Sequence, residues 1–335
     1  FIHHSTGEAW LADGHGGLGI ALIDNNYFVS DTNYGWGSSF SAGSGTIGDN
    51  TDIGHWHAWF RGSQSASTFL PALFSESSQH CTYSRLATDP TGKNKIVMFK
   101  SCYPNSEFAA DGGTIPPISS NPLADKSCGG SSHTVSNAKG IYIDLLEYFK
   151  LHQDTLFVAI AAPPLVSSSS GAEARRFNNW LANFTHGWLA GYPYSNVVAY
   201  DYYNVLTAAA AHHRVVGGAI EHVVVNGQDL SYYPTSTSNS HPNAAGDQKA
   251  TTEYLPWLNA MYHRWAGSLP SGFGDNSPSN GGIDGTSSVH KESSHYSTKH
   301  VSSHHQVDAK SSHHNSYVDG CSAIAANALM SFAVV

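Results

Sequence analysis

The sequence predicts an α/β fold in which helices cover both faces of a mostly parallel sheet. Continuous apolar runs of strand length occur at Ile96–Lys100 and Leu156–Ala161, as expected of strands that are buried on both faces. Segments with apolar residues at helical spacing lie between such runs, and strands that alternate with helices favour parallel pairing. We therefore expect a three-layer α/β/α, flavodoxin-like arrangement with a sheet of about five strands.

The individual elements follow from the same patterns. The strand candidates are Phe1–His4, Tyr27–Ser30, Ile96–Lys100, Leu156–Ala161 and Val197–Asp201. Amphipathic helices are expected after Asn137, after Glu173 and after Asn243, where apolar residues recur every three or four positions. Asn243 is a favourable N-cap, and Pro256 is expected to bend or break the last helix.

The composition changes at about residue 266. Residues 1–265 form the expected α/β domain, 266–318 a Gly/Ser/His-rich linker or tail, and 319–335 an apolar C-terminal segment. Seven of the 21 histidines lie between His290 and His314, which is typical of a solvated linker or, alternatively, of a weak metal-binding or pH-sensitive tail. We expect this tail to pack on a neighbouring subunit, so that the chain self-associates.

Charge and composition exclude two classes of partner. The net charge is -9 and no Lys/Arg cluster occurs, so nucleic acid is not an expected partner. No apolar run is long enough to cross a bilayer.

A charged fraction of 12% with many Ser, Asn, Tyr and Trp residues is typical of secreted, extracellular proteins. Because the chain begins at Phe1 rather than Met, either a leader has been removed or the N-terminus is incomplete. Asn183 begins an N-glycosylation sequon.

No metal or cofactor is expected. The four cysteines (Cys81, Cys102, Cys128 and Cys321) lack C-x-x-C spacing, so they predict disulfides rather than zinc, with one bond among the first three. His55 and His57 lack a third ligand, which favours packing. The glycines between Gly14 and Gly19 follow no suitable strand and predict no dinucleotide site.

Polar residues and glycines gather where the predicted strands end. Ser5 follows the first strand, Gly35 and Gly37 follow the second, Asn105 follows the third and Asp201 the fifth. The carboxyl ends of parallel strands meet at one edge of the sheet, where ligands bind. These positions therefore predict a site at that edge.

Two of these segments carry a family resemblance. The run Phe1–Gly7 is similar to the first block of the SGNH (GDSL-like) hydrolases, in which the first strand ends in a nucleophilic serine. The run His241–Gly246 is similar to the last block, in which a histidine precedes the C-terminal helix. The resemblance covers residues 1–265, and the H-P-N-x-x-G block is its most specific part. The third block is looser, since Tyr103–Ser106 does not have the usual Gly-x-Asn-Asp form.

The resemblance implies acyl transfer on a small ester or an acetylated carbohydrate. His241 would take the proton of Ser5 so that the hydroxyl attacks the ester carbonyl. The oxyanion would be held by backbone N–H groups near Ser5 and near Gly35 or Gly37, together with the amide of Asn105.

One departure from the family bears on this activity. The aspartate that usually lies two or three residues before the histidine is replaced by Ser238 and Asn239. An amide can hold an imidazole tautomer, but it does not stabilise an imidazolium as a carboxylate does. Asp201, at the end of the fifth strand, or a backbone carbonyl could take over this role.

Three functions therefore remain open. The first is a serine esterase. The alternative is a catalytically impaired SGNH-like domain that serves as a structural, self-assembling extracellular protein. The third is a sugar-binding module whose groove is formed by tryptophans, although aromatic side chains of this kind more often form the core; the tryptophans are Trp10, Trp36, Trp56 and Trp59.

Overall fold

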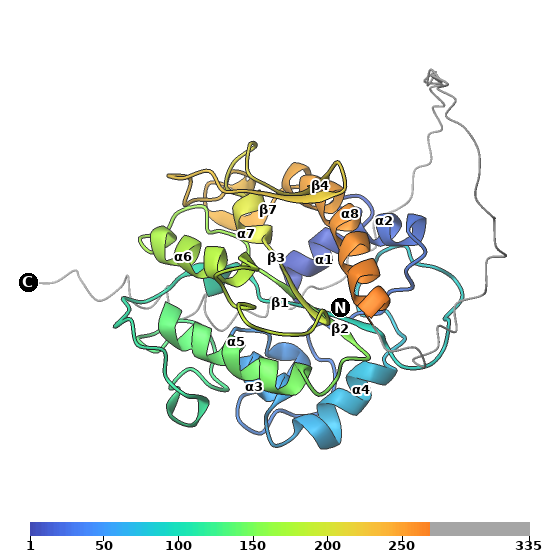
Figure 1. Cartoon of the computed structure of the whole chain (residues 1–335), viewed down its shortest axis with the longest axis horizontal. Coiled ribbons are helices and arrows are strands. Elements are labelled where there is room, and N and C mark those ends of the chain that lie inside the picture. The colour runs from blue at the N-terminus through green and yellow to red at the C-terminus, as the bar shows by residue number, and fades with distance from the viewer. Residues whose placement is uncertain (269–335) are drawn as a thin grey trace, which may run out of the picture.

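A computed structural model describes residues 1–268 of the chain, and in these residues a parallel sheet of three strands lies among the helices (Figure 1). The strands are β1 (Ile96–Lys100), β2 (Leu156–Ile160) and β3 (Val197–Tyr200), in the order β1-β2-β3. Phe157 of β2 pairs with Val97 on one side and with Val197 on the other. Every residue of β2 is buried, as the continuous apolar run predicts. The molecule is thus a mixed α/β protein.

The first residues of the chain lie beside β1. Ile2 forms isolated parallel bridges with Phe99 on one side and with Thr32 on the other. Its N–H donates to the carbonyl of Met98 at 2.8 Å, and its carbonyl accepts from the N–H of Lys100 at 3.1 Å. The start of the chain is therefore bonded to the sheet through its backbone.

The expected sheet of about five strands is regular over only three. The segments Phe1–His4 and Tyr27–Ser30, expected as strands, contribute no regular strand, and the contacts on this side of β1 are the bridges at Ile2. For Phe1–His4 the reason is local, because α1 begins at Ser5 and leaves no length for a strand after the bridge at Ile2.

Helices surround the sheet on two sides. They are α1 (Ser5–Leu11), α2 (Leu18–Asp24), α3 (His55–Phe60), α4 (Leu70–Ser75), α5 (Val135–Phe149), α6 (Gly171–Ala182), α7 (Tyr202–Val205) and α8 (Ala244–Ser268). Shorter helical turns are η1 (Ile47–Asp49), η2 (Ser65–Phe69), η3 (Tyr103–Ser106) and η4 (Ile118–Ser120). Helices α1 and α2 pack on α8, whereas α3 packs on α5. Figure 1 shows β1, β2 and β3 between these two groups.

The last helix differs from its prediction in one respect. The side chain of Asn243 accepts the N–H of Gly246 at 2.9 Å, as its choice as an N-cap implies. Pro256 does not end α8, which continues to Ser268. Trp257 next to it is fully buried, and such burial offsets the cost of about 3 kcal/mol that an internal proline brings. Residues 266–268, expected in the linker, belong to this helix, and the rest of the predicted tail, including Cys321, lies outside the described residues.

Two small hairpins were not expected from the sequence. Strands β4 (His212–Val216) and β5 (Ala219–Val223) form one, and β6 (Pro234–Ser236) and β7 (Asn239–Pro242) form the other. Gly217 and Gly218 connect β4 to β5 with φ values of 59° and 84°, the left-handed conformation that a tight two-residue hairpin turn requires. The second hairpin places His241 just before α8.

The predicted disulfide is not present. Cys81 and Cys102 are both thiols, so no bond joins any two of Cys81, Cys102 and Cys128. Each expected pairing among these three would have used at least one of the two residues that are thiols.

The four tryptophans considered for a sugar groove lie in the core. Trp10, Trp56 and Trp59 are fully buried and Trp36 is 7% exposed, so none of them forms an open platform. Asn183 is exposed in the turn that follows α6, where its side-chain oxygen accepts the N–H of Thr185. Within residues 1–268, no helix has both the length and the apolar character needed to span a membrane.

The bridge at Ile2 gives a test of how far the start of the chain contributes to stability. Ile2 is fully buried, whereas Ile20 in α2 is 42% exposed. We expect Ile2→Ala to lower the free energy of unfolding by about 2–5 kcal/mol, because it leaves a cavity beside β1. Ile20→Ala removes the same atoms at the surface and should cost less than about 1 kcal/mol. Urea unfolding measures both, and equal losses would contradict the role given to Ile2.

Candidate active site

Ser5 and His241 meet at the start of α1. The hydroxyl Oγ of Ser5 lies 2.8 Å from Nε2 of His241, and this contact joins residues 236 positions apart. Nδ1 of His241 lies 2.6 Å from the side-chain oxygen of Asn239, which also accepts the backbone N–H of His241 at 3.0 Å. An amide oxygen can only accept, so Nδ1 carries the proton and Nε2 is the acceptor for the hydroxyl of Ser5. The structure thus brings these two predicted residues into hydrogen-bonding contact.

The segment that follows β1 borders this pair. The ring of Tyr103 lies edge-on to the imidazole of His241, with centroids 4.9 Å apart. Sγ of Cys102 lies 3.6 Å from Oγ of Ser5. The carboxyl end of β1 therefore forms one wall of the site, as the strand-end argument predicts.

Asn105 lies in the same segment, but its amide has other partners. Its NH2 group donates to Oδ1 of Asp52 at 2.6 Å and to the carbonyl of Cys102 at 3.3 Å, while its oxygen accepts the N–H of Ile53 at 2.8 Å. Both amide hydrogens are therefore engaged, and an oxyanion could receive one of them only if a buried bond broke. In this arrangement Asn105 joins the loop at Asp52 to the segment that follows β1 through hydrogen bonds.

Gly35 and Gly37 lie in a turn in which the N–H of Gly35 already has an acceptor. Both have a left-handed backbone, with φ values of 74° and 80°. The N–H of Gly35 donates to Oδ1 of Asp49 at 2.8 Å. A Cβ atom on Gly37 would lie 2.8 Å from Cγ2 of Ile47, so close packing as well as φ requires glycine there.

Asp201 does not support the imidazole of His241. Its carboxylate lies 2.5 Å from Nε2 of His222 and accepts the N–H and the side-chain amide of Asn204. Burial raises the pKa of Asp201, but the hydrogen bond and the charge of His222 outweigh burial and leave this pKa below its usual value. Asn239 occupies the position at His241 that an acid would take.

A cavity of about 630 Å³ opens beside the nucleophile candidate. It lies between α1, the turn after α1 and a loop of the 76–95 segment; its lining residues include Ser5, Glu8, Asp13, His15, Thr82 and Tyr83. Glu8 accepts the amide of Asn33 at 3.0 Å, and this bond orients one acidic side chain of the cavity. Ser5 therefore borders a cavity large enough for a small ester.

A buried lysine contacts the first turn of α1, and the sequence patterns did not predict it. Lys100 is 1% exposed, and its amine donates to the hydroxyl of Thr6 and to the carbonyl of Ser101. Burial lowers the pKa of Lys100 to about 8. A cation that ends an apolar strand was the available signal, since such a charge is rarely buried without a role.

A hydroxyl bonded to an imidazole whose other nitrogen is fixed is the pair that nucleophilic catalysis uses. No protein-family model, curated protein or solved structure matches this chain. The functional assignment therefore rests on the geometry of the site.

The lowered pKa of Lys100 predicts a specific pH dependence of stability. Above a folded-state pKa of about 8 the buried amine loses its proton, while the unfolded chain keeps it up to the ordinary value of 10.5. Because the unfolded state then binds more protons, the wild type gains about 2–3 kcal/mol relative to Lys100→Met between pH 7 and about pH 10. Urea unfolding at both pH values tests this. The control is Lys95→Met, because Lys95 is exposed just before the same strand; a similar pH-dependent gain relative to this variant would refute the burial argument.

Proposed function

We propose that this chain is a serine ester hydrolase of SGNH type, acting on a small ester or an acetylated carbohydrate by acyl transfer. The observation that carries the proposal is the 2.8 Å contact between Oγ of Ser5 and Nε2 of His241. The bond from His241 to Asn239 supports it, because that bond fixes the tautomer in which Nε2 can accept a proton.

The reaction follows from this geometry in two stages. In the first stage His241 takes the hydroxyl proton as Oγ of Ser5 attacks the ester carbonyl, and the alcohol leaves with that proton. In the second stage His241 takes a proton from water as the water oxygen attacks the acyl carbonyl, and it gives that proton to Oγ of Ser5 as the Oγ–acyl bond breaks and the acid leaves. The N–H groups of Gly7 and Glu8 donate to the carbonyl of His4, so we assign the oxyanion to the N–H groups of Ser5 and Thr6 at the start of α1.

The strand contacts support a flavodoxin-like sheet as the finer fold. The bridges at Ile2 place the residue-32 segment and the chain start on the outer side of β1. Counted in chain order, the five segments then have the spatial order 2-1-3-4-5, which is the order of that fold class. With α1, α2 and α8 on one face and α3 and α5 on the other, we infer a three-layer arrangement.

A second candidate function has one observation in its favour. An amide rather than a carboxylate holds Nδ1 of His241, and such a group stabilises an imidazolium less well. This favours a catalytically impaired domain with a structural, self-assembling role. For either function we propose an extracellular location, supported by the low charged fraction of 12% and by the exposed Asn183.

Removal of the Ser5 hydroxyl distinguishes the serine esterase from the catalytically impaired domain. We expect Ser5→Ala to lower the hydrolysis of p-nitrophenyl acetate by at least about a hundredfold, because the nucleophile is lost. Ser75→Ala, the same change at the exposed end of α4, should leave the rate unchanged. Equal rates for wild type and Ser5→Ala would remove Ser5 from the mechanism.

Restoring the acid tests the role of Asn239. We expect Asn239→Asp to raise kcat for the same ester by about tenfold or more, because a carboxylate at Nδ1 stabilises the imidazolium that forms in the transition state. Ser238→Asp adds the same charge to the neighbouring exposed position and should change kcat little. An unchanged kcat in Asn239→Asp would show that His241 is not the base.

A further inference from the structure

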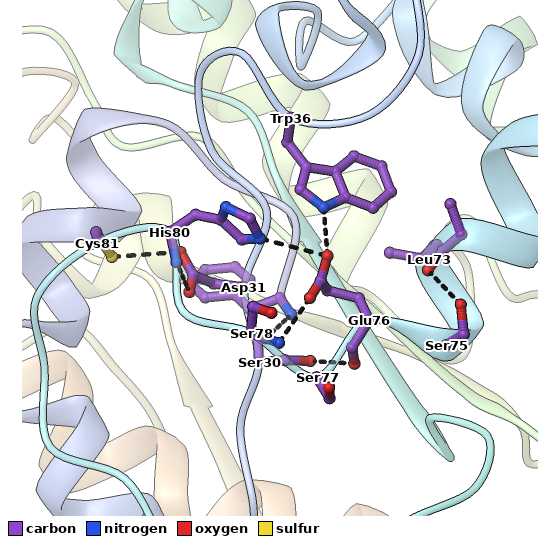
Figure 2. A network of polar contacts seen from close by, with 12 residues as sticks. Ser30, Asp31, Trp36, Leu73, Ser75, Glu76, Ser77, Ser78, His80 and Cys81 are labelled. Atoms are coloured by element: carbon purple, nitrogen blue, oxygen red, sulfur yellow. Dashed lines mark hydrogen bonds and ion pairs between the residues drawn. The ribbon is translucent and has the colours of Figure 1, made fainter.

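A second group of polar side chains lies behind the nucleophile candidate. Nε2 of His3, Oδ2 of Asp31 and Sγ of Cys81 all lie within 4.8 Å of one another. The nitrogen and the oxygen are 3.1 Å apart, the sulfur and the oxygen 3.3 Å, and the sulfur and the nitrogen 3.9 Å. His3 and Asp31 are fully buried and Cys81 is half-buried. Figure 2 shows Asp31 beside Cys81, within a larger network of polar contacts.

The size of this triangle suits a zinc-class ion. Zinc binds imidazole nitrogen, carboxylate oxygen and thiolate sulfur at roughly 2.0–2.3 Å, so in a tetrahedral site neighbouring ligand atoms lie roughly 3.3–3.6 Å apart. The three distances in the protein lie around this range. The donor set contains a thiol and an imidazole, and it therefore favours zinc or cobalt over magnesium or calcium.

The hydrogen bonds of His3 also suit a metal ligand. Nδ1 of His3 lies 2.9 Å from the carbonyl of His4, and since a carbonyl can only accept, Nδ1 carries a proton. The other nitrogen, Nε2, faces an oxygen of Asp31 at 3.1 Å. A positive charge, either a proton on this nitrogen or a metal ion, belongs between these two atoms. A metal-bound histidine characteristically donates its other N–H to a carbonyl in this way.

The hydrogen bonds of Asp31 direct one of its oxygens toward His3 and Cys81. Its other oxygen, Oδ1, accepts the N–H of His80 at 2.8 Å and the hydroxyl of Tyr83 at 2.9 Å. These bonds leave Oδ2 facing the nitrogen and the sulfur. A carboxylate held through one oxygen while the other binds metal is the usual arrangement around such ions.

We propose that His3, Asp31 and Cys81 bind one divalent cation of the zinc class. The thiol proton of Cys81 goes to solvent as the sulfur–metal bond forms. The ion joins the 76–95 segment, which contains no helix or strand, to the start of the chain. Thr82 and Tyr83 follow Cys81 directly and line the cavity beside Ser5, so the ion fixes that wall of the cavity. The metal site does not depend on the proposed ester hydrolysis.

Cobalt titration of the full chain tests the site, because a thiolate–cobalt bond gives a charge-transfer band in the near ultraviolet. After chelator treatment, we expect Co²⁺ to produce this band with one equivalent bound, and Zn²⁺ to remove it by displacement. Histidines between His290 and His314 can bind cobalt but produce no thiolate band. Cys81→Ser should abolish the band, whereas Cys102→Ser should retain it.

A second variant keeps the test decisive if Cys81→Ser fails to fold. Asp31→Asn keeps an acceptor for His80 and Tyr83, and we expect it to weaken cobalt binding on the order of 100-fold, as monitored by the same band. The proposal is overturned if the wild type gives no thiolate band at saturating Co²⁺. It is also overturned if Cys81→Ser retains the band or if Asp31→Asn binds cobalt as tightly as the wild type.

Discussion

The backbone hydrogen bonds and bridges of Ile2 position the start of the chain, and with it the residues of the candidate active site. Its bonds to Met98 and Lys100 attach the chain start to β1, and its bridge to Thr32 attaches the next segment on the other side. A chain held on both sides has one direction in which to leave the sheet, and Ser5 is where it turns into α1. The buried side chain of Ile2 stabilises this pairing through the hydrophobic effect.

Catalysis by His241 depends on two contributions from its neighbours, the orientation of the imidazole and a negative charge beside it. Asn239 orients the imidazole as an acid would, but it contributes no negative charge. The buried carboxylate of Asp201 cannot supply that charge, because His222 and Asn204 already hold it at the start of α7. If Ser5 is acylated, the imidazolium must be stabilised chiefly by solvent and by the amide dipole, which favours modest rates.

The sequence predicted β1, β2, β3, α5, α6 and α8 because each buries a long apolar pattern that is visible locally. The hairpin at Gly217–Gly218 also has a local signal, two glycines between apolar segments, but it lies outside the alternation of strands and helices that predicts the sheet. The pairing of Ser5 with His241 was expected from the family resemblance of their two segments. The partners of Asn105 and Asp201 could not be predicted in the same way, because Asp52 and His222 are distant in sequence and no pattern links them.

His3, His4 and Ser5 are consecutive, yet their side chains contact three different parts of the chain. This explains why sequence spacing does not reveal the group of His3, Asp31 and Cys81. His3 faces Asp31 and Cys81, whereas Nε2 of His4 lies 2.7 Å from the carbonyl of Gly48, and Ser5 contacts His241. His4 has an extended backbone with φ of -123° and ψ of -159°, and the chain becomes helical directly after it. This change of conformation sends neighbouring side chains to separate segments, so a zinc-class donor set can assemble without the C-x-x-C spacing that a metal search in the sequence relies on. The same change places His3 and Ser5 in separate surroundings, so a cation at the first need not alter the hydrogen bond of the second.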